Sequence, residues 1–532
     1  MSFLTSLVAR DISKAYGDRL VLDGVDLVAN PGQHLGLVGE NGIGKSTLLR
    51  LLGGTESLDS GEISRPQDVG YLGQEPEFPA GATVADVLAE ALAPLHESVR
   101  RLEQLACRIQ EPGAAGDYDR ALAWAQRHDA WDADRRAELA LARLGLGRLP
   151  ADRRVAEMSG GERTRLCLAL LIGRKPDCLL LDEPTNHLDD EAMEFLERFL
   201  LDQPGVVVVA SHDRVLLDRV CSVIVDLDPS HFGVDGEGGR RYRGGFTAYL
   251  RHKQRARQQW EEAFLRQQEE LGRLRLAAAT TARQVAHDRP PRDGDKFIYS
   301  FKGANVQATI RRRVREAEQR IQMLERSRVP EPPRPLAFDS PITSQPSSRA
   351  RIHISDLRVD GRLRLDRLEV SAGEHLLVCG ANGSGKSTLL GVLAGRLPAD
   401  QGQVTVSGGR VELLPQHVRF SRPEISADRL FAAMVGEQGR NLGDVGLLHP
   451  RDLRQPVGVL SVGQQRRLAL AVLVARQPDL LLLDEPTNSI SLALASELES
   501  ALERSPGTVV VASHDRWLRQ RWSGSMYRLD VG

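Results

Sequence analysis

The chain has 532 residues, of which 41% are hydrophobic and 27% charged, and a formal net charge of −2. This length and composition fit a globular protein of several domains. No apolar run approaches the roughly 18 residues that span a bilayer, and the N-terminal MSFLTSLVARD lacks a positive segment followed by a long apolar core. These features argue against a membrane-spanning or a secreted protein, so we expect a cytoplasmic protein that contacts no membrane.

The first motif in the chain is a phosphate-binding loop. An apolar strand over His34 to Val38 precedes Gly39-x4-Gly44-Lys45-Ser46, and a helical run over Thr47 to Leu52 follows it, which is the context that this motif requires. Glycines let backbone N–H groups surround phosphates, while lysine reaches the terminal phosphates and the serine hydroxyl is a ligand for Mg²⁺. The residues expected to hold ATP here are Gly39, Asn41, Gly42, Gly44, Lys45, Ser46 and Thr47.

Two apolar strands further along the first half carry acidic residues and a histidine. Leu179 to Leu181 read as a buried parallel strand that ends in Asp182 and Glu183, where an α/β sheet presents its carboxyl edge. Asp182 is expected to hold Mg²⁺, and Glu183 to orient or deprotonate the attacking water. The strand Val206 to Ala210 places His212 near the γ-phosphate, where we interpret it as a sensor rather than as a structural histidine.

These motifs recur in the second half, so the chain is an internal repeat. The two loop lysines are 341 residues apart, whereas the two catalytic glutamates and the two histidines are 302 apart. The first half therefore carries about 40 extra residues between Gln74 and Ser159. The second-half counterparts are Gly380, Asn382, Gly383, Gly385, Lys386, Ser387 and Thr388 in the loop, Asp484 for Mg²⁺, and Glu485 and His514 for catalysis.

With the run Ser159-Gly160-Gly161-Glu162 added, the motifs resemble the ATP-binding cassette (ABC) superfamily over nearly all of residues 5–250 and 350–532. The resemblance implies an α/β fold with two tandem P-loop ATPase domains that pair head to tail and bind ATP and Mg²⁺ at composite sites. Each loop lysine would then face the signature serine and glycine of the other domain. The signature residues that would bind nucleotide in this way are Ser159, Gly160, Gly161, Ser461 and Gly463.

The same resemblance assigns three more residues. Gln74 and Gln416 join the catalytic residues, and Tyr16 lies where the family stacks an aromatic ring on adenine. A buried strand tyrosine is the alternative for Tyr16. The expected Mg²⁺ ligands are Ser46, Asp182, Ser387 and Asp484.

The two ATP sites are expected to be unequal. The second signature reads Ser461-Val462-Gly463 and so has one glycine fewer than the first. Where the first half continues from DEPTN into His187-Leu188-Asp189, the second reads Ser489-Ile490-Ser491, and it has no aromatic residue between Ile352 and Gly373. We expect both sites to bind ATP and to turn it over at different rates.

A basic helical segment separates the cassettes, which we place at residues 1–250 and 351–532. Residues 251–330 contain 19 Lys and Arg against 10 Asp and Glu, which favours a polyanionic partner over a solvated helical face. Apolar residues recur at near-heptad spacing from Trp260 to Val285 and from Val306 to Leu324, and prolines at 290 and 291 end the first run. The pattern predicts an antiparallel α-helical hairpin within a linker of residues 251–350, with its tip at 289–303.

Cations and aromatic rings alternate at this tip. Such a composition suits stacking on unpaired bases and neutralising phosphates, although the rings could instead pack on each other to close the hairpin. Four arginines within five residues follow on the second helix, and they suit RNA phosphates. The residues expected to contact RNA are Lys296, Phe297, Tyr299, Phe301, Lys302, Arg311, Arg312, Arg313 and Arg315.

Two fused cassettes, the run DEPTNHLD from Asp182 to Asp189 and the basic linker together resemble the ABC-F family of ribosome-associated ATPases. The extra residues, including a helical stretch from Val99 to His128, match the place where that family inserts its arm, at about residues 90–135 here. Within the family, DKFIYSFKG at the tip and PTNSISLAL in the second half resemble the antibiotic-resistance branch of actinobacterial, macrolide type.

This resemblance implies a monomer whose ATP-closed cassettes dock on the ribosome. The linker would then reach 23S rRNA and P-site tRNA, where a drug of the macrolide, lincosamide or streptogramin class is displaced, and hydrolysis would release the protein. Two alternatives remain open, namely a housekeeping translation factor of the same family and the ATPase subunit of a drug exporter.

Overall fold

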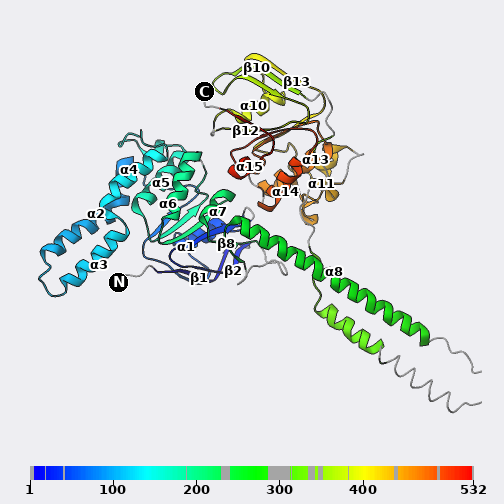
Figure 1. The fold of residues 1–532 in the computed structure, drawn as a ribbon, viewed down its shortest axis with the longest axis horizontal. Coiled ribbons are helices and arrows are strands. Elements are labelled where there is room, and N and C mark those ends of the chain that lie inside the picture. The colour runs from blue at the N-terminus through cyan, green and yellow to red at the C-terminus, as the bar shows by residue number, and fades with distance from the viewer. Residues whose placement is uncertain are drawn as a thin grey trace, which may run out of the picture. The chain divides into compact units, whose positions relative to one another are not determined.

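The computed structural model describes residues 5–17, 19–39, 42–186, 188–228, 240–285, 312, 314–332, 342–344, 351–380, 383–436, 441–487, 490 and 492–529. The chain forms two units. One holds both cassettes, in residues 1–228, 243–247 and 335–532, and the other holds the linker, in residues 229–242 and 248–334. Figure 1 labels the helices and strands along the chain.

The first cassette is built on a sheet with the strand order β5-β6-β7-β3-β8-β9, in which the pairs from β5 to β8 are parallel. The same cassette also contains an antiparallel sheet with the strand order β2-β1-β4. The strands are β1 (Leu7–Tyr16), β2 (Arg19–Ala29), β3 (His34–Val38), β4 (Ser60–Ser64), β5 (Val69–Leu72), β6 (Cys178–Asp182), β7 (Val206–Ala210), β8 (Val223–Asp226) and β9 (Arg241–Arg243). The helices are α1 (Lys45–Gly53), α2 (Val84–Cys107), α3 (Ala114–Arg127), α4 (Ala133–Arg143), α5 (Gly160–Arg174), α6 (Asp190–Leu201) and α7 (Arg214–Val220).

Both faces of the parallel sheet are covered. Along β7, Val206 and Val208 pack into the core that includes α1 and the antiparallel sheet, whereas Val207 and Val209 pack into the core that includes α5 and α6. Because side chains alternate across a strand, a strand buried on both faces reads as a continuous apolar run. This burial fixes the carboxyl ends of β6 and β7, where the acidic and histidine motifs begin.

The second cassette repeats this architecture. Its sheet has the order β14-β15-β16-β12-β17 with parallel pairing throughout, next to an antiparallel sheet of order β11-β10-β13. The strands are β10 (Arg351–Val359), β11 (Leu363–Val370), β12 (His375–Cys379), β13 (Gln401–Ser407), β14 (Val411–Leu414), β15 (Leu480–Asp484), β16 (Thr508–Ala512) and β17 (Ser525–Arg528). The helices are α10 (Lys386–Leu393), α11 (Ala427–Val435), α12 (Leu442–Val445), α13 (Val462–Arg476), α14 (Leu492–Glu503) and α15 (Arg516–Arg521).

The extra residues of the first half form a helical arm, in which α2 and α3 lie side by side (Figure 1). Thr83 caps α2 through a capping box with Asp86, which satisfies backbone donors at the helix start. The predicted helical stretch from Val99 to His128 is wrong in one respect, because a turn after Cys107 divides it into two helices. Pro112 and Gly113, whose φ is 86°, stand in this turn and cannot continue a helix.

The linker begins with α8 (Phe246–Val285), and residues 314–326 are also helical. The two segments run in opposite directions, because Trp260 Nε1 donates to Pro330 O at 2.9 Å whereas Glu270, further along α8, pairs with Arg320 at 3.1 Å. Trp260 and Leu271 of the expected apolar seam are buried. The tip, with Arg311 and Arg313, lies outside the described residues, so the closed hairpin stays a prediction. Of the expected RNA contacts, Arg312 and Arg315 are described, and both are exposed.

Candidate ATP-binding site

Each phosphate-binding loop enters its helix through a left-handed glycine. Gly44 has a φ of 112° and directly precedes α1, and Gly385 has a φ of 93° and directly precedes α10. A Cβ atom at Gly385 would lie 2.6 Å from the backbone oxygen of Arg362. Glycine is therefore required here by both conformation and space, and the helix N-terminus is left open toward an anion.

The two loop lysines are held in the same way. Lys45 Nζ donates to Gly39 O at 2.7 Å, and Lys386 Nζ donates to Gly380 O at 2.8 Å. Each ammonium group therefore lies within its own loop, where a bound phosphate would meet it.

The acidic residues lie at the ends of β6 and β15, as predicted. Both carboxylate oxygens of Asp182 are buried and lack a hydrogen-bond partner of ordinary geometry among the described residues. Burial raises the pKa of Asp182, against the opposing effect of the nearby Ser46 and Gln74 side chains. Gln74 Nε2 also donates to Ser46 Oγ at 3.2 Å.

A buried carboxylate next to a serine hydroxyl is an oxygen donor set that fits Mg²⁺. Asp484 is buried beside Ser387, and its pKa is likewise raised by burial. When bound, Mg²⁺ would neutralise charge on the phosphate oxygens, and Ser46, Asp182, Ser387 and Asp484 are the residues that would hold it.

The two expected catalytic glutamates share an unusual backbone. Glu183 has a φ of 49° and Glu485 a φ of 47°, in the left-handed region that costs most non-glycine residues energy and that concentrates at functional sites. The N–H of each donates to the last residue of the neighbouring strand, Ala210 or Ala512, at 2.8 Å. This bond fixes the backbone of each glutamate at the carboxyl end of its strand.

The partners of the two glutamates differ. His514 Nδ1 lies 2.7 Å from Glu485 Oε1, whereas His212 Nε2 lies 3.5 Å from Glu183 Oε1. The bond to Glu485 raises the pKa of His514, while burial lowers the pKa of His212 to about 4. Burial also raises the pKa of Glu183 to about 7. The two sites are thus unequal in the structure, in a way that the sequence comparison did not identify.

Tyr16 ends β1 and is 45% exposed, so the alternative of a buried strand tyrosine does not hold. Its hydroxyl donates to Glu56 Oε1 at 2.5 Å and accepts from Arg50 Nη2 at 3.1 Å. These bonds fix the ring while leaving it exposed, which suits the predicted role of stacking on a base.

The signature serines begin helices α5 and α13. Ser159 forms a capping box with Glu162, and Ser461 forms one with Gln464. Val462, which stands in place of a glycine, is 70% exposed. Arg466, on the same helix, is buried and donates to Gln416 O at 2.7 Å and to Asp484 O at 2.8 Å. Arg466 therefore connects the signature helix to the predicted catalytic glutamine and to the acidic strand end of its own cassette.

Residues of both halves line one cavity of about 1310 Å³. The predicted site residues in its lining are Tyr16, Gly42, Gly44, Lys45, Ser46, Thr47, Gln74, Glu183, His212, Gly383, Gly385, Lys386, Ser387, Thr388, Gln416, Glu485 and His514. Of the residues described, no signature residue is in this lining. That each loop lysine faces the signature residues of the other cassette therefore stays a prediction. Asn41 and Asn382 lie outside the described residues.

Two arginines are among the lining residues that sequence reasoning missed. Arg214 and Arg516 directly follow the two Ser-His-Asp (SHD) motifs, residues 211–213 and 513–515, and each contacts an acidic residue of the other cassette. The signal that could have found them is the arginine that follows SHD in both halves.

Two parallel-sheet domains, each with a glycine-rich loop, an acidic pair at a strand end and a signature helix, define a tandem ATP-binding cassette ATPase. The family model described as "ABC transporter" matches residues 22–186 and 363–488. The chain is 39% identical to the tylosin resistance ATP-binding protein TlrC of Streptomyces fradiae, over 99% of this chain and 98% of that protein. It is 33% identical to the energy-dependent translational throttle protein EttA of Escherichia coli K12, over 94% of this chain and 88% of that protein.

The chain therefore belongs to the ABC-F family of ATPases, and ATP hydrolysis is its reaction. Among solved structures, an archaeal ribosome recycling factor, aABCE1, in complex with the ribosomal stalk protein aP1 has a similar fold, with a TM-score of 0.56, 20% identity and coverage of 96% of this chain and 85% of that one. Across the described residues, every helix is too short or too polar to cross a membrane.

Proposed function

We propose that this ATPase binds the ribosome and protects it from antibiotics of the macrolide class. The observation that carries the proposal is the 39% identity to a tylosin resistance protein, which extends over nearly the full length of both chains and so includes the linker. In the proposed cycle, ATP binding closes the cassettes, the linker reaches 23S rRNA and P-site tRNA, and hydrolysis releases the protein.

The described part of the linker supports a polyanionic partner. Along α8, Arg255, Arg266 and Arg273 are exposed, and exposed guanidinium groups bind RNA phosphates. Ion pairs on the same helix, such as Arg266 with Glu262 at 2.9 Å, are exposed, so they contribute little stability and leave these cations able to exchange partners.

Ribosome binding is tested by co-sedimentation. The double variant Glu183→Gln, Glu485→Gln keeps both loops for ATP binding and lacks the glutamates expected to promote hydrolysis, so it should remain with 70S ribosomes when ATP is present. The same variant without nucleotide is the matched control and should stay in the supernatant. Absence from the ribosome pellet with ATP would overturn the proposal and would favour the ATPase subunit of an exporter.

Protection is tested by expressing the intact protein in a susceptible host. We expect the inhibitory concentration of a macrolide to rise. The inhibitory concentrations of a lincosamide and a streptogramin are measured in the same assay. The variant Lys45→Ala, Lys386→Ala, which lacks both loop lysines, should give no protection. Unchanged inhibition by all three classes in the presence of the intact protein would contradict this function.

A housekeeping role in translation is the second candidate, and the 33% identity to the translational throttle protein EttA favours it. It predicts the same ATP-dependent co-sedimentation without a change in drug susceptibility. The two assays together therefore separate the two candidates.

A further inference from the structure

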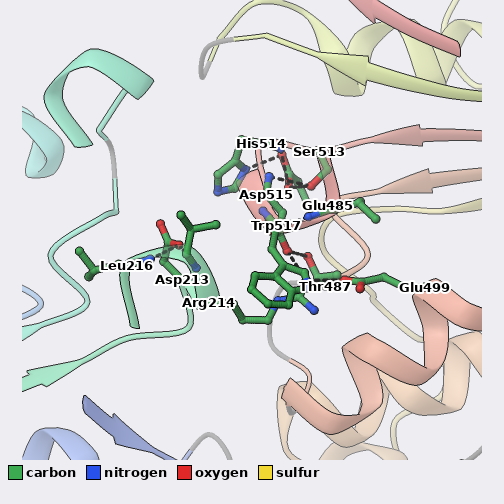
Figure 2. Close-up of polar contacts among 12 residues, drawn as sticks. Asp213, Arg214, Leu216, Glu485, Thr487, Glu499, Ser513, His514, Asp515 and Trp517 are labelled. Carbon is green, nitrogen blue, oxygen red and sulfur yellow. Dashed lines mark hydrogen bonds and ion pairs between the residues drawn. The ribbon is translucent and has the colours of Figure 1, made fainter. Parts of the chain in front are cut away.

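Two buried arginines form a reciprocal contact between the cassettes. Arg214 begins α7 and is 1% exposed, and Arg516 begins α15 and is 9% exposed. They are 302 residues apart, which is also the separation of the catalytic glutamates, so they occupy the same position in the two copies. Figure 2 shows Arg214 with its partners from the second cassette.

Each arginine reaches two carboxylates of the other cassette. Arg214 Nη2 donates to Asp515 Oδ2 at 2.8 Å and also contacts Glu499. The mirror contacts are Arg516 Nη2 to Asp213 Oδ2 at 2.8 Å and to Glu197 Oε1 at 2.6 Å. The paired carboxylates are also 302 residues apart. The contact therefore has a pseudo-two-fold symmetry. In each pair, the arginine comes from one cassette and the carboxylate from the other.

The arginine contact leads to the catalytic residues through short hydrogen bonds. The two carboxylate oxygens of Asp515 have different donors. Oδ1 caps α15 by accepting from the N–H of Trp517 at 2.9 Å, and Oδ2 accepts from Arg214. The N–H of Asp515 donates to Ser513 Oγ at 3.0 Å, and Ser513 Oγ donates to Glu485 Oε2 at 3.2 Å. A residue of the first cassette thus holds the turn that carries the second histidine, and this turn contacts the second glutamate.

The first cassette has the matching arrangement. Asp213 Oδ1 caps α7 by accepting from Val215 N at 2.9 Å, and its N–H donates to Ser211 Oγ at 3.0 Å. The N–H of His212 donates to Glu183 Oε2 at 3.1 Å. Arg516 therefore holds the turn of the first site as Arg214 holds the turn of the second.

Burial makes each arginine dependent on its partners. A buried guanidinium that loses its carboxylate is left as an uncompensated charge, and leaving one charge of a buried pair alone is strongly destabilising. For Arg214, burial works to lower the pKa, but Asp515 and Glu499 outweigh it and raise the pKa. Loss of both carboxylates is therefore costly for each arginine, which suits a contact that reports the position of one cassette to the other.

We propose that Arg214 and Arg516 are positioning residues for ATP hydrolysis in trans, each orienting the histidine turn of the site in the opposite cassette. Each arginine comes from the cassette opposite to the histidine turn that it orients. This inference depends on the ATPase reaction and not on ribosome binding.

Site-resolved hydrolysis tests the proposal. In the Glu183→Gln background the remaining turnover belongs to the second site, and there Arg214→Gln should lower kcat about tenfold, the lower end of the effect of residues that orient catalytic groups. In the Glu485→Gln background the same substitution should leave the first site little changed. Arg516→Gln should show the opposite pattern, and Arg214→Lys and Arg516→Lys should restore part of the activity. Equal losses at both sites would overturn the proposal.

Arg519→Gln is the matched control, because the Arg519 side chain also crosses between the cassettes, to Asp190 at 2.6 Å, and forms its ion pair there rather than with Asp213 or Asp515. If this variant reproduces the site-specific losses, the arginines act only as interface supports. A double-mutant cycle provides a second measurement with both sites active. The losses from Arg214→Gln and Asp515→Asn should be non-additive, because the two side chains contact each other; additive losses would overturn the proposal.

Discussion

His514 lies 2.7 Å from Glu485, whereas the equivalent His212 lies 3.5 Å from Glu183. The second glutamate is thus held by a short hydrogen bond to the ring, and the first is held mainly through the backbone N–H of its histidine. The same two residue types, glutamate and histidine, therefore give two different local geometries within one chain.

We predict that the two sites turn over ATP at different rates. Glu183→Gln and Glu485→Gln should each slow their own site by about 10²- to 10⁴-fold, the usual contribution of a positioned acid or base, so the activity that remains in each variant is that of the other site. Phosphate release under steady state should then differ between the two variants. Equal residual rates would count against unequal sites.

A second prediction concerns Mg²⁺. Asp182→Asn replaces a buried carboxylate with an amide of similar size, so it should raise the Mg²⁺ concentration needed for half-maximal turnover at the first site by roughly 10- to 100-fold. The measurement is a Mg²⁺ titration in the Glu485→Gln background. Asp202→Asn, at an exposed position after α6, should leave the titration unchanged, and an unchanged Asp182→Asn curve would rule out this ligand.

The signature helices should differ in their contribution to stability. Arg466 in the second cassette donates to buried carbonyl groups, so Arg466→Met should lower the free energy of unfolding by roughly 1.5–3 kcal/mol, the usual range for hydrogen bonds to a charged group. The equivalent residue of the first cassette is Thr164, which donates to Gly160 O at 3.0 Å on its own helix.

Thr164→Val is therefore the matched comparison and should cost about 1 kcal/mol. Denaturant unfolding followed by circular dichroism measures both variants. Equal losses of unfolding free energy in the two variants would contradict the prediction. The hydrogen bonds of Arg466 to carbonyl groups would then stabilise the fold no more than the single bond of Thr164 does.

The linker should depend on Trp260. Its indole N–H donates to Pro330 O and its ring is buried, so Trp260→Phe should destabilise the pairing of the two linker segments by about 1 kcal/mol. Hydrogen exchange along residues 314–326 should become faster. Leu265→Ala, at a position that is 60% exposed, is the control, and it should change exchange no more than the wild type varies between preparations.

The elements around the nucleotide motifs could be predicted from the sequence because their signals are local. The strand expected at Val206 to Ala210 has those bounds in the structure, and Asp182 and Glu183 stand at a strand end as expected. An apolar run between polar turns determines such a strand without reference to distant residues. The arm was predicted less well, because the expected helical stretch contains Pro112 and Gly113, which divide it.

The contact of Arg214 with Asp515 could not be predicted in this way. The two residues are 301 apart, and no periodicity connects side chains that meet only after two domains have folded. The difference between the two histidines has the same origin, because both motifs read SHD and their geometry is decided by the packing around each turn. Only the repeat itself, with arginine after SHD in both copies, held information about the contact.

The arm lies entirely between Gln74 and Ser159, and every residue of the reciprocal contact follows it in the first copy. The contact residues consequently keep one constant separation between the copies, whatever the length of the insertion before them. Insertions and deletions in the arm can therefore change its length, and the surface that it offers to a partner. They leave the residues of the interface between the two ATP sites unchanged.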